Sequence, residues 1–140
     1  MKFTKIIKPS VLKASLFVVF FSLVISRTLF TNQLFRSDDL ELHGARLANY
    51  YLSIKQGQVP PYWAPNLNHG FGYPVFIFGY HLPYMVSTFF YALGANIELS
   101  LNITIILLIA FGGLGVFTFS YLKNKNTFLA IVSSIVYQTT

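Results

Sequence analysis

The feature that most constrains this chain is a long apolar run near its amino terminus. Residues 11–30, VLKASLFVVFFSLVISRTLF, carry two charges, Lys13 near the start and Arg27 near the end. About 20 helical residues cross the hydrocarbon core of a bilayer, and long basic side chains near the ends can reach the headgroups. A cleaved signal peptide is the alternative, but the apolar core is long and no A-x-A cleavage pattern follows it. We therefore expect residues 11–30 to form a retained transmembrane helix.

Further apolar runs follow, and the composition agrees with them, since 54% of the residues are hydrophobic and 10% are charged. We expect a second transmembrane helix at 75–93 and a third at 99–122, where the small residues of FGGLG let another helix approach closely. Residues 127–140 are apolar but too few to cross, so we expect a truncated fourth span and further helices in a longer chain. The fold class expected is an all-α integral membrane protein, a transmembrane helix bundle.

The charge balance of +6 does not indicate nucleic acid binding. Four lysines precede or begin the first apolar run, where basic residues commonly hold a flank in the cytosol, and no soluble segment shows a basic face with interleaved aromatics. The absence of cysteine excludes a disulfide framework, a thiolate nucleophile and a cysteine zinc site. The expected partner is therefore the lipid bilayer, with no nucleic acid.

The orientation of the spans is set mainly by the first helix, because the charge count on the two sides is nearly balanced. A multi-pass plasma-membrane protein with residues 1–10 as a basic cytosolic tail would place residues 31–74 outside, 94–98 inside and 123–126 outside.

The outer loop, residues 31–74, has the room for chemistry and begins with an amphipathic helix at about 38–56. Ser37, Asp38 and Asp39 suit a helix start, and Gly57 suits the position just past its end. At 100 degrees per residue, one face of this helix carries polar groups and an adjacent stripe is apolar. We expect the apolar stripe to lie in the headgroups and the polar face to line a cleft; a solvated face with an Asp39–His43 pair is the alternative. The polar face consists of Asp39, His43, Arg46 and Tyr50, and the apolar stripe of Leu40, Leu47, Tyr51 and Ile54.

The rest of the outer loop, QVPPYWAPNLNHGFGYP, is rich in proline, glycine and aromatic residues. Four prolines prevent a regular helix or central strand, while Gly70 and Gly72 permit turns. Aromatic rings such as that of Trp63 settle at membrane interfaces. We expect a rigid aromatic loop that leads into the second span, with a kink at Pro83 and with His81 packed in that helix.

The segment from Asp38 to Tyr84 resembles the start of bacterial multi-span proteins of the 6-pyruvoyl-tetrahydropterin synthase-related membrane protein family, whose layout is similar to that of the glycosyltransferase C superfamily. The run that carries the resemblance is an acid followed by His43, Arg46, Gly57, Pro60, Trp63, Pro65, Gly70, Gly72, Tyr73, Pro74 and Pro83.

The resemblance implies a large polytopic glycosyltransferase-like protein that takes a sugar from a polyprenyl-phosphate carrier on the outer face. It implies that an acid near the end of the first span serves as general base or helps to hold a divalent metal, the one cofactor that the resemblance suggests. The histidines are too scattered for a catalytic zinc. Two other classes stay open, a non-catalytic transporter or lipid-handling subunit and a small membrane anchor. The candidate catalytic residues are Asp39, Asp38 and His43, and the candidate substrate-binding residues are Arg46, Trp63, His69 and Tyr73.

Overall fold

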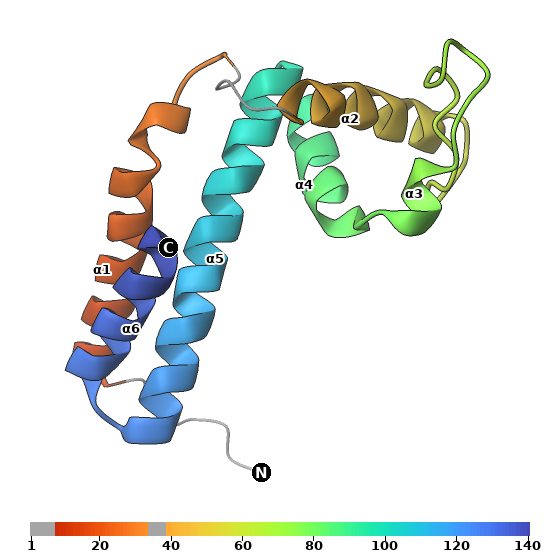
Figure 1. The fold of residues 1–140 in the computed structure, drawn as a ribbon. Coiled ribbons are helices and arrows are strands. Elements are labelled where there is room, and N and C mark those ends of the chain that lie inside the picture. Colours follow the sequence, from red (N-terminus) through yellow and green to blue (C-terminus); the bar gives the residue numbers. More distant parts are fainter. Residues whose placement is uncertain (1–7, 34–38) are drawn as a thin grey trace. The chain divides into compact units, whose positions relative to one another are not determined.

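The computed structural model describes residues 8–33 and 39–140, whose regular secondary structure is helical; among them one isolated β-bridge occurs and no β-strand. The all-helical fold class is thereby confirmed. The chain divides into two compact units, unit 1 (Met1–Thr28 and Ile105–Thr140) and unit 2 (Leu29–Thr104). The helices are α1 (Pro9–Ile25), a 3-10 turn (Arg27–Leu29), α2 (Leu40–Lys55), α3 (Val75–Phe78), α4 (His81–Ala92), α5 (Ile97–Asn124) and α6 (Thr127–Thr139) (Figure 1).

Helix α5 matches the expected third span. Its 28 residues rise about 42 Å, and among the described residues it is the one helix both long enough and apolar enough to cross a membrane. Helices α1 and α6 are apolar but shorter. Helix α1 ends at Ile25, before the expected Phe30, because the backbone tightens after Ser26 into a 3-10 turn, a common way for a helix end to satisfy its last carbonyls.

The prediction of one continuous helix at 75–93 is wrong. The chain breaks at Gly79 and Tyr80, which separate the short α3 from α4. Pro83 gives the reason, because a proline ring inside a helix clashes with the carbonyl four residues earlier, here that of Gly79. Pro83 instead lies in the first turn of α4, where its missing N–H leaves no hydrogen bond unmade. The 12 residues of α4 rise about 18 Å, which is less than the hydrocarbon core of about 30 Å.

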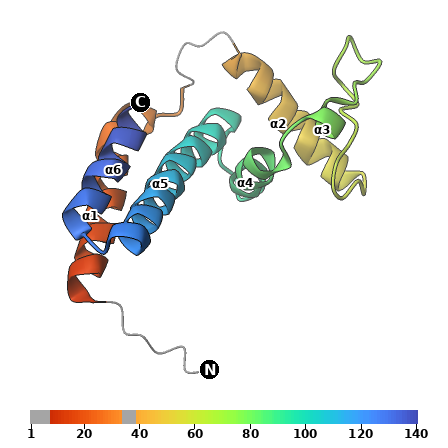
Figure 2. The same ribbon diagram turned by 60° about the horizontal axis from the view of Figure 1, so that its bottom comes forward.

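Unit 1 consists of α1, the part of α5 from Ile105 onward, and α6, which lie side by side in both ribbon views (Figures 1 and 2). Its apolar core is small and contains Ala14, Val18, Phe117 and Ala130. The glycines of α5 lie against α6, since a Cβ on Gly112 would stand 2.8 Å from the Tyr137 ring and one on Gly113 would overlap the Gln138 amide. The expected role of FGGLG in close helix packing is thereby confirmed for its two adjacent glycines.

A chain of hydrogen bonds crosses the three helices of unit 1. Ser22 Oγ on α1 donates to Gln138 Oε1 on α6 at 2.8 Å, and Gln138 Nε2 donates to Ser134 Oγ at 3.0 Å. Ser134 Oγ in turn donates to the carbonyl oxygen of Gly113 on α5 at 2.8 Å. Interhelical hydrogen bonds of this kind hold apolar helices together where the surroundings are also apolar.

The helix directions in unit 1 bear on the expected topology. Helix α6 runs parallel to α1 and antiparallel to α5 (Figure 1), so Lys8 at the start of α1 and Lys123 at the end of α5 lie at the same end of the unit. If both helices cross the membrane, residues 123–126 lie on the same side as the amino terminus. The expectation that they lie on opposite sides rested on counting 75–93 as a crossing.

Unit 2 is built around the packing of α2 against α3, α4 and the first residues of α5. Its core contains Leu47, Tyr50, Ala64, Phe76, Tyr84 and Leu101. Leu40 and Leu47 are 7% and 0% exposed, so these two leucines of the expected apolar stripe pack inside the protein. The expectation that this stripe lies in the headgroups is therefore wrong, because α3 and α4 cover it.

The aromatic loop between α2 and α3 is closed on itself and tied to α2. Ala64 and Tyr73 exchange two backbone hydrogen bonds of 2.8 and 3.0 Å, which form the isolated bridge. Ser53 Oγ of α2 donates to the Trp63 carbonyl oxygen at 2.6 Å, and the Asn66 N–H donates to Asn49 Oδ1 at 2.8 Å. The prediction that this loop is not helical is confirmed.

Candidate functional site

The polar face of α2 meets aromatic side chains of α4 through two histidine–tyrosine pairs. His43 Nδ1 lies 2.8 Å from the Tyr84 hydroxyl, and the Tyr50 hydroxyl lies 3.2 Å from His81 Nδ1. The tyrosine rings also contact each other, with Tyr50 and Tyr84 stacked at 5.7 Å between centroids. Both histidines are thus held by the fold, as expected for His81, and the proposed Asp39–His43 pair does not form among the described residues.

Burial determines the protonation of this cluster. Loss of solvent lowers the pKa of His43 below its ordinary value, the nearby Arg46 cation lowers it further, and Asp39 partly offsets both. Burial also raises the pKa of Tyr50, which keeps its hydroxyl protonated. At neutral pH His43 is therefore a neutral hydrogen-bonding group rather than a cation.

The carboxylate of Asp39 is exposed at the start of α2 and makes no hydrogen bond within the part of the chain that the structure describes. Asp39 occupies the N-cap position, but its carboxylate makes no capping hydrogen bond. Its backbone carbonyl oxygen accepts a hydrogen bond from the His43 N–H at 3.1 Å, so the helix proper begins at Leu40. This leaves a solvent-facing carboxylate that can accept a proton or a hydrogen bond. Asp38 and Ser37 lie outside the described residues.

Two of the four candidate substrate-binding residues come together in a hollow of about 370 Å³ on unit 2. Arg46 from α2 and Tyr73 from the loop line it, and Asn68 adds an amide. The rest of the lining is apolar, so one cation and two neutral polar groups face an otherwise hydrocarbon surface. Arg46 is half-buried and Tyr73 is exposed. Asp39 and His43 do not line this hollow, whose remaining walls are Leu42, Ala45, Leu67 and Val75.

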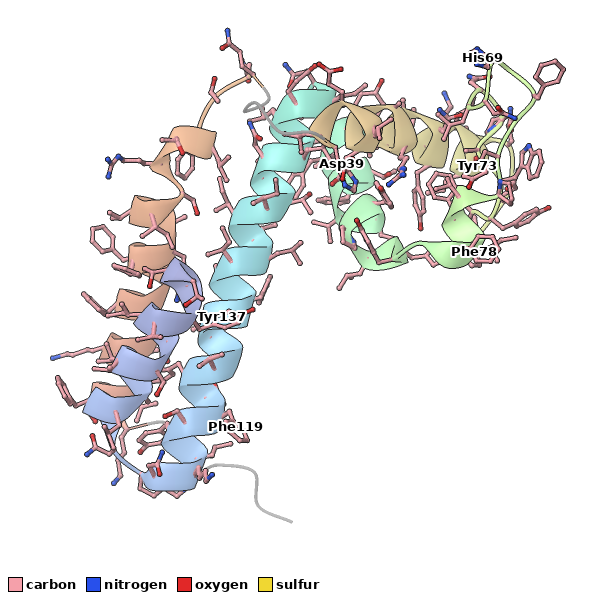
Figure 3. The ribbon with its side chains drawn as sticks, viewed as in Figure 1. Asp39, His69, Tyr73, Phe78, Phe119 and Tyr137 are labelled. Carbon is pink, nitrogen blue, oxygen red and sulfur yellow. The ribbon has the colours of Figure 1, made fainter. Side chains whose placement is uncertain are left out.

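Trp63 and His69 lie apart from that hollow. The Trp63 indole lies directly over Gly72, in the space that a Cβ would take, and so has a structural position in the loop. His69 is exposed at the loop tip with a φ of 57°, well away from Asp39 (Figure 3). The structure therefore does not place these two residues in one site with Arg46.

Asn68 is the polar residue of the hollow that the sequence interpretation missed. Its φ of 54° is left-handed, a conformation that asparagine tolerates better than most residues. The signal was present in the sequence as Asn68-His69-Gly70, a typical turn composition. What the sequence could not show is that this turn brings the asparagine beside Arg46.

A second hollow of about 440 Å³ lies between the loop residues 57–62 and the α3–α4 region, and His81 reaches it. The described residues contain no group of three or more acidic, histidine or cysteine side chains that could hold a metal ion. The candidate divalent metal thus has no complete ligand set in that part of the chain.

Comparison with protein-family models, with curated proteins and with solved structures finds no match to this chain.

Proposed function

We propose that this chain belongs to a multi-pass plasma-membrane protein that binds a polyprenyl-phosphate-linked sugar at the outer face and transfers the sugar to a hydroxyl acceptor. The observation that carries the proposal is the hollow beside Arg46, where a single guanidinium faces apolar walls. A phosphate with a hydrocarbon tail combines the same two features, because guanidinium pairs with phosphate oxygens and the prenyl chain needs an apolar surface.

The proposed transfer requires one base and one anion-binding group. The acceptor oxygen attacks the anomeric carbon, the bond between that carbon and the phosphate oxygen breaks, and the carrier phosphate leaves with the bonding electron pair. The acceptor proton passes to a carboxylate, for which Asp39 is the candidate because it is exposed on the helix that carries Arg46. Arg46 stabilises the charge on the departing phosphate.

One observation favours binding without catalysis. Asp39 does not line the hollow that holds Arg46, so the two groups are not assembled into one site by the described residues. A lipid-handling subunit, which needs the cation and the apolar walls but no base, is therefore the second candidate function.

The binding half of the proposal is tested with a polyprenyl phosphate in nanodiscs. We expect Arg46→Gln to weaken binding about tenfold or more, which is the size of one charge-assisted hydrogen bond. Lys55→Gln is the matched control, because Lys55 is a cation of the same helix that lies over the Tyr51 ring outside the hollow. Equal binding by both variants and the parent protein contradicts the assignment, and equal competition by inorganic phosphate shows that the lipid tail is not recognised.

The catalytic half is tested by sugar transfer from a labelled polyprenyl-phosphate donor with protein expressed from the complete gene. Asp39→Asn should remove most turnover while leaving donor binding intact, because the amide cannot accept the proton. Glu41→Gln, an exposed acid of the same helical turn, should keep full turnover, and Asp38→Asn tests the neighbouring acid. Wild-type transfer by both aspartate variants leaves the lipid-handling function as the explanation of the hollow.

A further inference from the structure

We propose that the α3–α4 segment is embedded in one leaflet of the bilayer, with its exposed apolar side chains in contact with lipid and without crossing to the other side. This goes beyond the sugar-transfer function and does not depend on it.

Helix α4 exposes apolar side chains and buries polar ones, which is the reverse of a helix on the surface of a soluble protein. Its exposed stripe is entirely apolar and spans about 100 degrees of the helix surface. Phe89 in this stripe is 59% exposed, and Phe78 at the end of α3 is 85% exposed. A soluble protein covers such a contiguous patch or uses it for binding. The stripe consists of Leu82, Met85, Phe89 and Ala92 of α4 and continues to Leu93.

The opposite face of α4 carries the hydroxyl groups and points into the protein. Ser87 is 0% exposed and its Oγ donates to Thr104 Oγ1 of α5 at 2.8 Å. Tyr84 on this face is buried in the core of unit 2, where its hydroxyl contacts His43. Polar groups inside and hydrocarbon outside is the arrangement expected in lipid, where a hydroxyl such as that of Ser87 needs a partner within the protein; the buried Thr88 Oγ1 has no such partner among the described residues.

The distribution of charged residues also indicates that lipid surrounds α3 and α4. No lysine, arginine, aspartate or glutamate occurs between Lys55 and Glu98, which covers the loop, α3 and α4. Helix α2, by contrast, carries Glu41, Arg46 and Lys55. Unit 2 therefore has a charged layer formed by α2 and an uncharged layer formed by α3 and α4, as expected of a domain with one side in the membrane.

Chain geometry keeps α4 close to the bilayer. Helix α5 begins at Ile97, a few residues after α4 ends at Ala92, and α5 is long and apolar enough to cross. An extended residue spans at most about 3.5 Å, so the few residues between the two helices keep the end of α4 near the start of α5. With a rise of about 18 Å, α4 cannot cross, but it can lie within one leaflet.

The side chains of the stripe favour lipid over another protein helix as the contacting partner. Helix contacts inside a membrane are enriched in small residues that let backbones approach, as Gly112 and Gly113 do against α6. The stripe contains four large side chains, those of Leu82, Met85, Phe89 and Leu93, and one small residue, Ala92 at the end of α4. Such large, flexible side chains suit disordered acyl chains better than a close helix contact.

Spin labels test this inference directly, because the protein has no cysteine. Single-cysteine variants Met85→Cys and Phe89→Cys are labelled and placed in nanodiscs, with Glu41→Cys on the charged layer as the matched control. Lipid contact predicts that the two α4 labels are mobile, collide more with oxygen than with a water-soluble nickel chelate, and lie between the headgroups and the bilayer centre. The Glu41 label should show the reverse preference.

Three outcomes overturn the inference. Nickel access at Met85 and Phe89 equal to that at Glu41 places the stripe in water. Immobilised labels with little access to either reagent show that another helix or a second copy covers it. A depth for Phe89 beyond the bilayer centre shows a crossing.

Discussion

At the residue scale, the contact between Trp63 and Gly72 defines the aromatic loop. Trp63 is the single tryptophan of the chain. Its Nε1 occupies the space of a Cβ on Gly72, whose φ of 81° also disfavours any other residue. The loop is thus fixed by one ring lying on one glycine, next to the bridge between Ala64 and Tyr73.

Two matched substitutions distinguish the effect of this contact from the effect of backbone strain. Gly72→Ala should displace the indole and shift the fluorescence emission of Trp63, because the new methyl group overlaps the ring. Gly70→Ala carries a similar backbone penalty, with φ at 88°, but has open space for a Cβ and should leave the emission unchanged. Equal spectra for the two variants and the parent protein would show that the indole does not depend on Gly72.

At the element scale, the glycines of α5 decide how closely α6 approaches. Gly113 faces Gln138, the residue that links Ser22 of α1 to Ser134 of α6, whereas Gly115 faces open space. The two glycines lie two residues apart in the same helix, so their intrinsic helix propensities are equal.

We expect Gly113→Val to lower the free energy of unfolding of the protein by about 1–3 kcal/mol relative to Gly115→Val, which is the usual range for overpacking. The valine at position 113 must push Gln138 away and so breaks the hydrogen bonds between α1 and α6. Thermal unfolding in detergent measures the difference, and Gly115→Val serves as the control for the valine itself. Equal stability of the two variants contradicts close packing of α5 on α6.

At the scale of the whole molecule, the helix directions in unit 1 bring basic residues together at one end of the unit. Lys8 just before α1, Lys13 in its second turn, Lys123 at the end of α5 and Lys125 just after it lie at one end of the unit. Basic residues concentrate on the cytoplasmic side of membrane proteins. The chain leaves unit 1 after Thr28 and returns at Ile105, both at the other end, so residues 29–104 are expected outside.

Thiol labelling of intact cells tests this topology. If α3 and α4 do not cross the membrane, as we propose, cysteines placed singly at Asn66 and Asn96 should both react with an impermeant reagent. A cysteine at Asn126, beside Lys125, should react only after the membrane is permeabilised. If the cysteine at Asn96 is protected and the one at Asn126 is labelled, residues 75–93 cross the membrane as first expected. If none of the three is labelled in intact cells, the orientation is the opposite one.

The sequence by itself determined the features that depend on local chemistry. Apolar content and length predicted α5 and α6 within a few residues, and the acid pair and Gly57 predicted the bounds of α2. Close packing at Gly112 and Gly113 was also visible, since adjacent small residues in an apolar helix allow few other uses. Arg46 and Tyr73 were recognised as candidate ligands for a substrate, and both line the same hollow.

The tertiary structure decided what depends on contacts between distant residues. Hydropathy cannot distinguish a crossing helix from a broken segment of the same apolar content, so the break at Gly79 and Tyr80 was missed. The apolar stripe of α2 fits a membrane surface or a protein partner equally well, and only the packing of Leu47 against α3 and α4 shows that the protein covers it. The partner of His43 is Tyr84, 41 residues away on another helix, and helical spacing along α2 alone could not identify it.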